Sequence, residues 1–352
     1  MRILFIGNSQ PTLNAMLKAE AMTRLGHEVV VEDPYSEFRP KISRSRIKSA
    51  LHYRSGYRFM QRQIEAWVRQ ITALHPSVDA VWVEGGELFG PGCVKQLAQL
   101  APIVLSTPDD PTGSRDGGRF GSLKRALPYY TACSVRVEKN RNEFIKLGCS
   151  NIIPVHMTYD EVAHRPFDSL DQIPSQFRSD VAFVGTWIPG ENRDQFLRRL
   201  AQLGVPLSIW GDAWQKSPLW SELQTHWRGP SVWRRDYVSA IQGSKIMIGM
   251  LSHQNRDQHT KRSFEVPYAG GLLCAERTAE HQKLFREGQD ALLWSTAEEC
   301  AELCLQILND EERRHAIRSN GMERVRQLGV GNEPMCDKVL NALLAHAASN
   351  TS

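Results

Sequence analysis

The feature that most constrains the fold is a repeated alternation of short apolar runs with longer segments of helical character. In the first half the runs predicted as strands are residues 2–6, 28–32, 78–84, 102–106, 131–135 and 151–155. In the second half they are residues 181–184, 206–210, 246–251 and 272–275. Apolar runs separated by helices favour parallel sheets covered on both faces, so the prediction is an α/β protein.

The pattern also predicts where one domain ends. The chain has 352 residues, which suits two domains better than one core. Residues 159–180 are polar, contain proline and show neither period, so the junction is placed there. We predict two Rossmann-like domains with a cleft between them, at 1–165 and 166–334, and a C-terminal helix at 335–352 that packs back towards the first domain. The other predicted helices are 13–25, 47–74, 193–203, 297–309 and 310–328.

Composition limits the kind of protein. The hydrophobic content of 41% and charged content of 23% are ordinary for a soluble globular chain. The first apolar run is too short for a signal peptide, and none approaches the length of a membrane span. The seven cysteines are scattered, which favours the cytoplasm. Cys300 and Cys304 lack partners at metal-ligand spacing, so they are interpreted as packing thiols, with no metal and no cofactor predicted.

Residues 39–69 are strongly basic and interleaved with aromatic side chains. Nine cations face one acid, Glu65. The cations are Arg39, Lys41, Arg44, Arg46, Lys48, Arg54, Arg58, Arg62 and Arg69. This region is either a solvated helix face or a surface for anionic lipid or an anionic glycan acceptor. The lipid alternative implies peripheral contact at the inner face of a membrane. The composition alone would permit nucleic acid, but no recognition module surrounds it, so none is expected.

The segment 261–274 contains the most specific site pattern. Lys261 and Arg262 open a short helix that carries Glu265, and Gly270 and Gly271 end that helix before a new strand. Asp257 precedes Glu265 by eight residues. Open α/β sheets hold nucleotide diphosphates with backbone amides and positive charge for phosphate and a carboxylate for ribose. The alternative is an ordinary amphipathic helix with solvated charges.

Further donor-side candidates follow other strands of the second half. Gly185 and Thr186 leave the strand at 181–184, and Arg193 on the next helix is placed for bidentate contact with phosphate. The alternative for Arg193 is an ordinary surface arginine. Trp210 and Gly211 end the next strand, and Trp233 precedes Arg234 in a later loop. These tryptophans either flank a nucleotide base or belong to the core.

The first half offers polar residues where strands end. Gly7, Asn8 and Ser9 follow the first strand and either line the cleft on the acceptor side or merely turn the chain. Glu84 ends the predicted strand at 78–84 and Glu87 follows it, so both share that edge. Asp109 and Asp110 follow the strand at 102–106. They either cap a turn before Pro111 or bind and deprotonate an acceptor hydroxyl.

Taken in order, these motifs resemble the two-domain (GT-B) glycosyltransferases, most closely those related to spore maturation protein CgeB. The resemblance rests on R-x-F-E-x-P-x-A-G-G at 262–271, F-V-G-x-W followed by arginine at 183–193, and D-D-P at 109–111. Residues 153–167 and 284–288 add to it, so it covers most of the chain. It implies a metal-independent glycosyltransferase of hexosyltransferase type in glycan or cell-envelope biosynthesis. The second domain would hold a nucleotide-diphosphate sugar, and the first would present a hydroxyl of a glycan, lipid-linked glycan or protein.

The resemblance also implies roles for individual residues. Glu265 matches the second acid of the family's E-x7-E pattern, which holds the donor ribose. Asp257 stands where that pattern has its first glutamate, near the donor sugar, and its shorter side chain is a departure. Lys261 and Arg262 are candidate diphosphate partners. The pattern implies retention of anomeric configuration, whereas inversion would make Asp109 or Asp110 the base.

Two other functions fit the same sequence. One is a two-domain nucleotide-sugar epimerase, which would convert free donor. The other is a noncatalytic glycan- or membrane-binding protein on a degenerate GT-B fold.

Overall fold

The computed structural model describes residues 1–10, 14–43, 45–149 and 151–349. The chain divides into two compact units. Unit 1 comprises residues 1–156, 254–256 and 332–352, and unit 2 comprises residues 157–253 and 257–331. The predicted limits were 165/166 and 334/335. Two predicted positions, Leu13 at a helix start and Arg44 in the basic region, lie outside the described residues.

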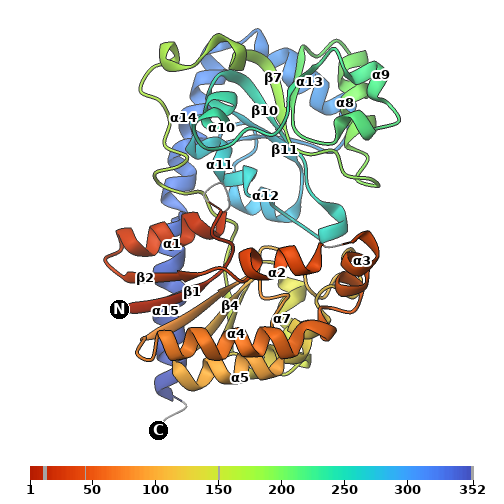
Figure 1. Cartoon of the computed structure of the whole chain (residues 1–352). Coiled ribbons are helices and arrows are strands. Elements are labelled where there is room, and N and C mark those ends of the chain that lie inside the picture. The colour runs from red at the N-terminus through yellow and green to blue at the C-terminus, as the bar shows by residue number, and fades with distance from the viewer. Residues whose placement is uncertain (11–13, 44, 150, 350–352) are drawn as a thin grey trace. The chain divides into compact units, whose positions relative to one another are not determined.

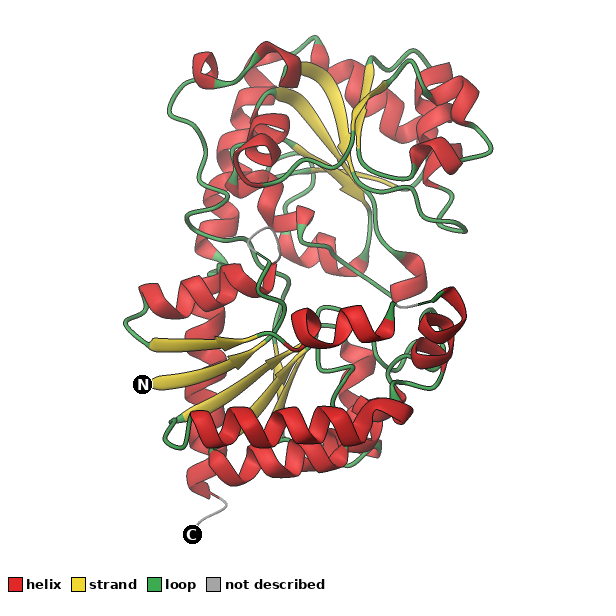
Figure 2. Ribbon diagram, in the orientation of Figure 1, coloured by secondary structure: helices red, strands yellow, loops and turns green. Residues whose placement is uncertain are grey.

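Unit 1 contains a parallel six-stranded sheet in the order β2-β1-β3-β4-β5-β6. Its strands are β1 (Arg2–Ile6), β2 (Glu28–Glu32), β3 (Ala80–Glu84), β4 (Ile103–Ser106), β5 (Ala132–Val135) and β6 (Ile152–Pro154). Its strands are the yellow arrows in the lower part of Figure 2.

Helices cover both faces of this sheet (Figure 1). Leu4 and Ile6 pack with α4 (Gln61–Leu74), α5 (Pro91–Leu100), α6 (Gly121–Ala126) and α7 (Glu138–Lys146). Ile3 and Phe5 point to the other face, where they join α1 (Asn14–Arg24) and α15 (Asn332–Ser349) in a second core. The alternation follows from the two-residue period of a strand. The C-terminal helix α15 thus completes the core of unit 1.

Unit 2 contains a second parallel six-stranded sheet, in the order β12-β11-β10-β7-β8-β9. Its strands are β7 (Ser179–Val184), β8 (Leu207–Trp210), β9 (Trp227–Gly229), β10 (Ser244–Gly249), β11 (Leu273–Glu276) and β12 (Leu292–Trp294). One face packs against α8 (Arg193–Gln202) and α13 (Ala297–Leu308), and the other against α10 (Arg234–Gln242) and α11 (Arg262–Tyr268). Two α/β units with parallel sheets confirm the predicted fold class.

The prediction of one continuous helix at 47–74 is wrong, because the structure has two helices and a turn there. It divides into α3 (Arg46–Arg54), a 3₁₀ turn (Arg58–Met60) and α4. Tyr57 adopts a left-handed backbone with φ of 59°. Gly56 fits so closely that a side chain there would meet the Gly118 carbonyl oxygen at 2.7 Å. The remaining helices are α2 (Pro34–Ile42), α9 (Trp220–Leu223), α12 (Ala279–Leu284) and α14 (Glu311–Gln327).

Candidate functional site

The topology of unit 2 defines a switch point between β7 and β10. These strands are neighbours, but β7 leads to β8 and β9 on one side, whereas β10 leads to β11 and β12 on the other. Ligands of open α/β sheets bind outside the carboxyl ends of the strands at such a point. The loops that leave β7 and β10 here are residues 185–192 and 250–261 (Figure 1).

Two arginines meet these loops. Arg193, the first residue of α8, donates from one terminal nitrogen to the Thr186 carbonyl oxygen at 2.9 Å and from the other to the Leu251 carbonyl oxygen at 3.3 Å. Arg262, the first residue of α11, donates from Nε to the Val184 carbonyl oxygen at 2.6 Å. Two guanidinium groups therefore lie at the switch point of unit 2.

The positive charge of Arg193 is only partly compensated. The residue is 9% exposed, and its Nε is buried without a hydrogen-bond partner in the described part of the chain. Burial, followed by the nearby charge of Arg262, lowers the pKa of Arg193 to about 10, although Glu191 and Asp257 oppose this. A buried cation is unfavourable unless it is paired with an anion. The arrangement therefore suits an anionic ligand with phosphate geometry.

Glu265 is a buried carboxylate on the same helix as Arg262. It is 6% exposed, and the Tyr237 hydroxyl donates to its Oε2 at 2.7 Å. Burial, and then the charge of Glu265, raises the pKa of Tyr237 well above its ordinary value, so this hydroxyl stays a neutral donor. His164 places Nε2 3.7 Å from Glu265 Oε1. The Asp160 amide donates to His164 Nδ1 at 2.8 Å, so the ring proton lies on Nε2, facing the carboxylate.

A second histidine, His281, positions the start of α11. Its Nδ1 donates to the Glu276 carbonyl oxygen at 2.6 Å, so its Nε2 accepts from the Ser263 hydroxyl at 2.7 Å. The Ser263 oxygen in turn accepts the Thr260 amide at 3.0 Å. Lys261, directly before this helix, is half-buried. The chain of hydrogen bonds holds the segment in which the predicted diphosphate partners lie.

These two histidines predict a pH dependence of stability. Burial lowers the pKa of His164 and of His281 below 6.5, so folding favours the neutral form of both rings. The unfolded chain binds protons below pH 6.5 that the folded one does not, so stability falls as the pH drops through that value. We expect denaturant titrations to give a smaller free energy of unfolding at about pH 5.5 than at about pH 7.5. The free energy of unfolding of His164→Asn should fall less between about pH 7.5 and about pH 5.5 than that of the unchanged protein. An equal fall in both proteins would contradict a contribution of His164 to this pH dependence.

Asp257 lies in the loop after β10. It is 8% exposed, and its amide donates to the Ser252 carbonyl oxygen at 3.4 Å. Glu191, in the loop after β7, accepts from the Ser252 hydroxyl at 2.9 Å and from the His253 amide at 3.0 Å. The two switch-point loops are thus tied together through Glu191.

Tryptophans hold the glycine loops at this edge. Trp214 Nε1 donates to the Gly185 carbonyl oxygen at 2.8 Å, and Trp227 Nε1 donates to the Gly211 carbonyl oxygen at 3.1 Å. A side chain at Gly211 would meet the Gly185 carbonyl oxygen, so only glycine fits there. Trp210 belongs to the core, with its ring centroid 6.3 Å from that of Phe177.

Trp233 differs from these buried tryptophans. It is the N-cap of α10 and is 51% exposed. It precedes Tyr237 by about one helical turn. Arg234 follows it with a positive φ of 51°. Trp233 therefore offers an exposed aromatic face after β9, at the ligand edge of the sheet.

Gly270 and Gly271 lie at the opposite, amino-terminal edge, where α11 turns into β11. Gly270 has φ of +78°, and its amide donates to the Pro267 carbonyl oxygen. A side chain at Gly271 would meet Ile241 Cγ2 at 2.6 Å. The contacts here serve helix termination and close packing.

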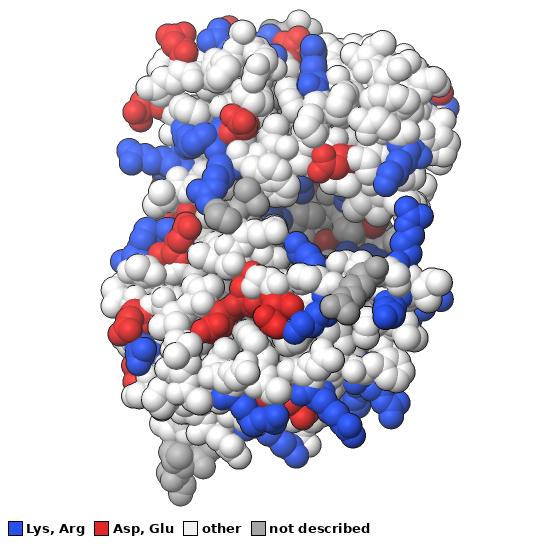
Figure 3. Space-filling view, viewed as in Figure 1, with Lys and Arg blue, Asp and Glu red and all other residues white. Residues whose placement is uncertain are grey.

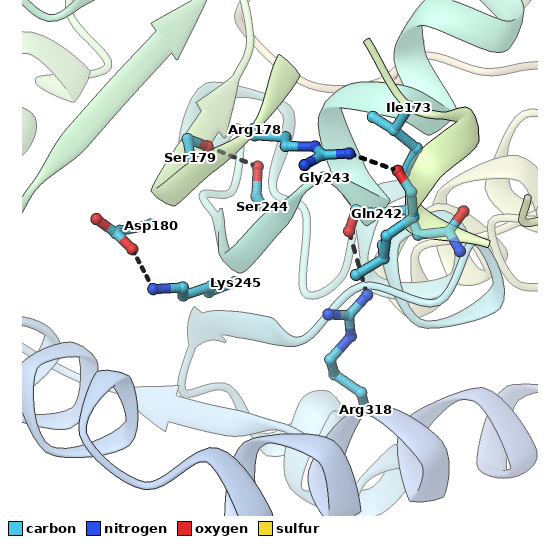
Figure 4. Close-up of a pocket in the computed structure, with 10 residues that line it drawn as sticks. Ile173, Arg178, Ser179, Asp180, Gln242, Gly243, Ser244, Lys245 and Arg318 are labelled. Atoms are coloured by element: carbon cyan, nitrogen blue, oxygen red, sulfur yellow. Dashed lines mark hydrogen bonds and ion pairs between the residues drawn. The ribbon is translucent and has the colours of Figure 1, made fainter. Parts of the chain in front are cut away.

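The same edge has a hollow of about 400 Å³ near the first residues of β7 and β10 (Figure 4). Its cations already have protein partners. Lys245 lies 2.6 Å from Asp180, and Arg178 donates to the Leu170 carbonyl oxygen at 3.2 Å. Arg318 donates to the Gly270 carbonyl oxygen at 2.8 Å. This hollow is separate from the switch point.

In unit 1, Gly7 follows β1, and Glu84 is the last residue of the neighbouring strand β3. A side chain at Gly7 would meet Glu84 Cβ at 3.2 Å. Lys18 Nζ lies 2.6 Å from Glu84 Oε1, and both side chains are buried. Asn8 accepts the Gln10 amide. The Ser9 hydroxyl donates to Asp33 at 2.7 Å. These contacts are within the unit.

Asp109 and Glu87 belong to an ion-pair cluster. Arg119 lies 3.1 Å from a carboxylate oxygen of each, and Arg115 lies 3.0 Å from Asp109. Tyr53 donates to Asp116 in the same cluster at 2.7 Å. The cations come from residues 115–119, a segment to which the sequence reasoning gave no role.

Asp110 is enclosed by donors within unit 1. Its Oδ1 accepts from Asn140 at 2.7 Å, Arg256 at 2.7 Å and the Gly113 amide at 3.0 Å, and Arg256 Nε also donates to Oδ2. Glu143 pairs with the same Arg256 at 2.9 Å. Burial alone would raise the pKa of Asp110, but the hydrogen bonds from Arg256 and Asn140 hold it below its ordinary value. A carboxylate held in this way is a weak base.

Cys300 and Cys304 lie in the core of unit 2 and are joined there by Cys274. Their three sulfur atoms lie within 4.8 Å of one another and are fully buried. Cys274 was not predicted to lie beside Cys300 and Cys304.

Comparison with known proteins agrees with the architecture. Residues 193–328, which span α8 to α14, match the family model described as glycosyl transferase-like. This match covers the greater part of unit 2 and less than half of the chain. The matched segment contains Arg193, Asp257, Arg262 and Glu265. No curated protein matches the sequence.

Solved structures show the fold of the whole chain. Anabaena HepE in complex with UDP is 14% identical with a TM-score of 0.66, over 98% of this chain and 100% of that one. A trehalose 6-phosphate synthase from Burkholderia multivorans is 13% identical, with a TM-score of 0.66 over 99% of each chain. Sucrose-phosphate synthase from Thermosynechococcus elongatus is 12% identical, with a TM-score of 0.66 over 100% of each. These likenesses show that the chain has the GT-B fold.

Proposed function

We propose that this protein is a glycosyltransferase that moves a hexose from a nucleoside-diphosphate sugar to a hydroxyl acceptor. The observation that carries the proposal is the pair Arg193 and Arg262 at the switch point of unit 2, with a partly compensated buried charge on Arg193. Glu265, on the helix that Arg262 begins, is a buried carboxylate suited to ribose hydroxyls. The complexes of Anabaena HepE with UDP and UDP-glucose support a nucleotide of this class.

In this proposal the side chains of unit 2 stabilise the departing diphosphate. Arg193 and Arg262 donate to phosphate oxygens, and Lys261 adds a third positive charge. Preorganised donors at the developing charge lower the barrier because they need no reorganisation during the reaction. Asp257 lies near the donor sugar, where its negative charge favours an oxocarbenium-like centre. The cationic groups supply the stabilisation without a metal ion.

We further propose that the reaction retains anomeric configuration. The alternative, inversion, needs a base, and Asp109 and Asp110 were the candidates. Asp109 is paired with Arg115 and Arg119, and the pKa of Asp110 is held low by Arg256 and Asn140. Groups held in this way are poor acceptors for the proton of an acceptor hydroxyl. A departing phosphate oxygen then takes that proton.

The test is a screen of uridine, guanosine, thymidine and cytidine diphosphate sugars incubated with the protein and no acceptor. We expect slow release of nucleoside diphosphate from one donor, because water replaces the missing acceptor. Isomerisation of the free donor would identify an epimerase instead. If none of the four donors released nucleoside diphosphate and calorimetry showed no nucleotide binding, the protein would be noncatalytic and the proposal would be overturned.

A further inference from the structure

Helix α3 of unit 1 presents an apolar stripe that the core does not use. None of its residues, all of which the structure describes, is buried. Ile47 is 83% exposed and Leu51 is 52% exposed, four residues apart and so on one face. Phe59, in the turn that follows, is 66% exposed. Large exposed apolar side chains that are grouped in this way mark an interaction surface.

The helix is held from its other side. The Tyr53 hydroxyl donates to Asp116 at 2.7 Å, and the Ser45 hydroxyl caps the first turn by accepting the Lys48 amide at 3.2 Å. Burial, followed by the hydrogen bond with Asp116, raises the pKa of Tyr53 to about 12, so this anchor persists at neutral pH. A nine-residue helix is marginal alone, so these contacts fix α3 with its stripe outward.

Cations surround the stripe. Arg46, Lys48, Arg54 and Arg58 are exposed, and among the described residues none of the four forms an ion pair with a carboxylate. In the lower right part of Figure 3, blue side chains are more frequent than red ones among the white surface. Lys41, in contrast, is paired with Glu37.

A hollow of about 630 Å³ lies beside the stripe, and its lining residues include Arg46, Arg54, Ser43, Ser45 and Ser49. At 100° per residue, Arg46 and Arg54 flank one side of Ile47 and Leu51, and Lys48 flanks the other. Guanidinium groups and hydroxyls are the donors that phosphate oxygens accept. The apolar stripe and the hollow suited to an anion therefore lie next to each other.

We propose that α3 and the turn after it are a docking surface for an anionic lipid bilayer. Ile47, Leu51 and Phe59 enter the interfacial region, the flanking cations pair with head groups, and the hollow receives a head-group phosphate. An anionic glycan would use the cations but would leave the three apolar side chains in water, so the observations favour lipid. In the described part of the chain no helix is long and apolar enough to cross a membrane. The proposal is independent of the donor site.

The test is sedimentation of the full chain with vesicles of phosphatidylcholine, alone or with about a third phosphatidylglycerol. We expect binding only to the anionic vesicles, and loss of binding as salt rises from about 0.1 M to about 0.5 M. Ile47→Ser with Leu51→Ser, and separately Arg46→Gln with Arg54→Gln, should each weaken binding at least about tenfold.

Matched controls lie on α7 of the same unit. Ile145→Ser removes another exposed apolar side chain, and Lys139→Gln with Lys146→Gln removes two exposed cations. Both controls should bind like the unchanged protein, and melting temperatures should match throughout because the α3 stripe is exposed. Equal loss in variants and controls would overturn the proposal. Binding to dextran sulfate without vesicle binding would also overturn it, in favour of an anionic glycan.

Discussion

Arg193→Met should abolish tight binding of a nucleoside diphosphate without unfolding the protein. The loss of charge-assisted hydrogen bonds to phosphate should weaken UDP binding by about 2–3 kcal/mol, on the order of 30- to 150-fold. The free energy of unfolding without ligand should change by less than about 1 kcal/mol, because replacing a poorly paired buried charge with an apolar side chain is often neutral. Calorimetry and denaturant titration measure the two quantities.

The matched control is Arg199→Met, on the same helix. Arg199 is 46% exposed at the side chain and pairs with Glu298, so its loss should alter neither quantity by more than about 0.5 kcal/mol. If Arg193 only linked the loops around Thr186 and Leu251, the outcome would be reversed. The free protein would lose several kcal/mol of stability, and a variant that still folded would bind UDP unchanged.

Glu265→Gln should remove the discrimination between ribose and dideoxyribose. The unchanged protein should bind UDP about 1–3 kcal/mol more tightly than 2′,3′-dideoxy-UDP, because a buried carboxylate accepts the two hydroxyl groups. In the variant the difference should fall below about 0.5 kcal/mol. Calorimetric titration of the unchanged protein and of the variant, each with UDP and with 2′,3′-dideoxy-UDP, gives the four binding free energies that this comparison needs.

Two further variants define the source of this effect. Tyr237→Phe keeps the carboxylate but removes the hydroxyl that holds Oε2, so its loss of discrimination should be smaller. Glu312→Gln changes an exposed carboxylate of unit 2 and should behave like the unchanged protein. A Glu265→Gln variant that still preferred ribose would assign the hydroxyl contacts to another group.

The layout of the fold could be predicted because strand positions depend on local apolar runs. The strands from β1 to β8, and β10 and β11, coincide with predicted runs within a few residues. The strands β9 and β12, each three residues long at a sheet edge, were not predicted, although β12 lies in the apolar run at 291–294. The break between α3 and α4 was not predicted because it depends on the close approach of Gly56 to the distant residues Gly118 and Gly121.

The candidate site could be predicted only in part. Arg193, Arg262 and Glu265 follow from their places after strands, because parallel strands bring their carboxyl ends to one edge. Tyr237 and His164, which contact Glu265, are distant from it in the sequence. No local sequence pattern predicts these two contacts. Glu191 could have been predicted as a site residue, because it is an acid two residues before Arg193 in the sequence.

Asp109 and Asp110 show the same limit. Their spacing after a strand suggested a catalytic base, but the partners that neutralise them cannot be read from the sequence. Arg256 follows β10, more than a hundred residues away, and yet donates to Asp110 within unit 1. The ion pairs and hydrogen bonds of these two acids hold loops of unit 1 together. That either acid acts as a catalytic base stays a prediction, and the geometry does not support it.

The most direct test of the central claim is a crystal structure of the protein with UDP bound. We expect the diphosphate to contact the guanidinium groups of Arg193 and Arg262 at the carboxyl ends of β7 and β10, and the ribose hydroxyls to contact Glu265. A nucleotide bound in the hollow at the opposite edge of that sheet, or anywhere that leaves Glu265 and both arginines without ligand contact, would contradict it.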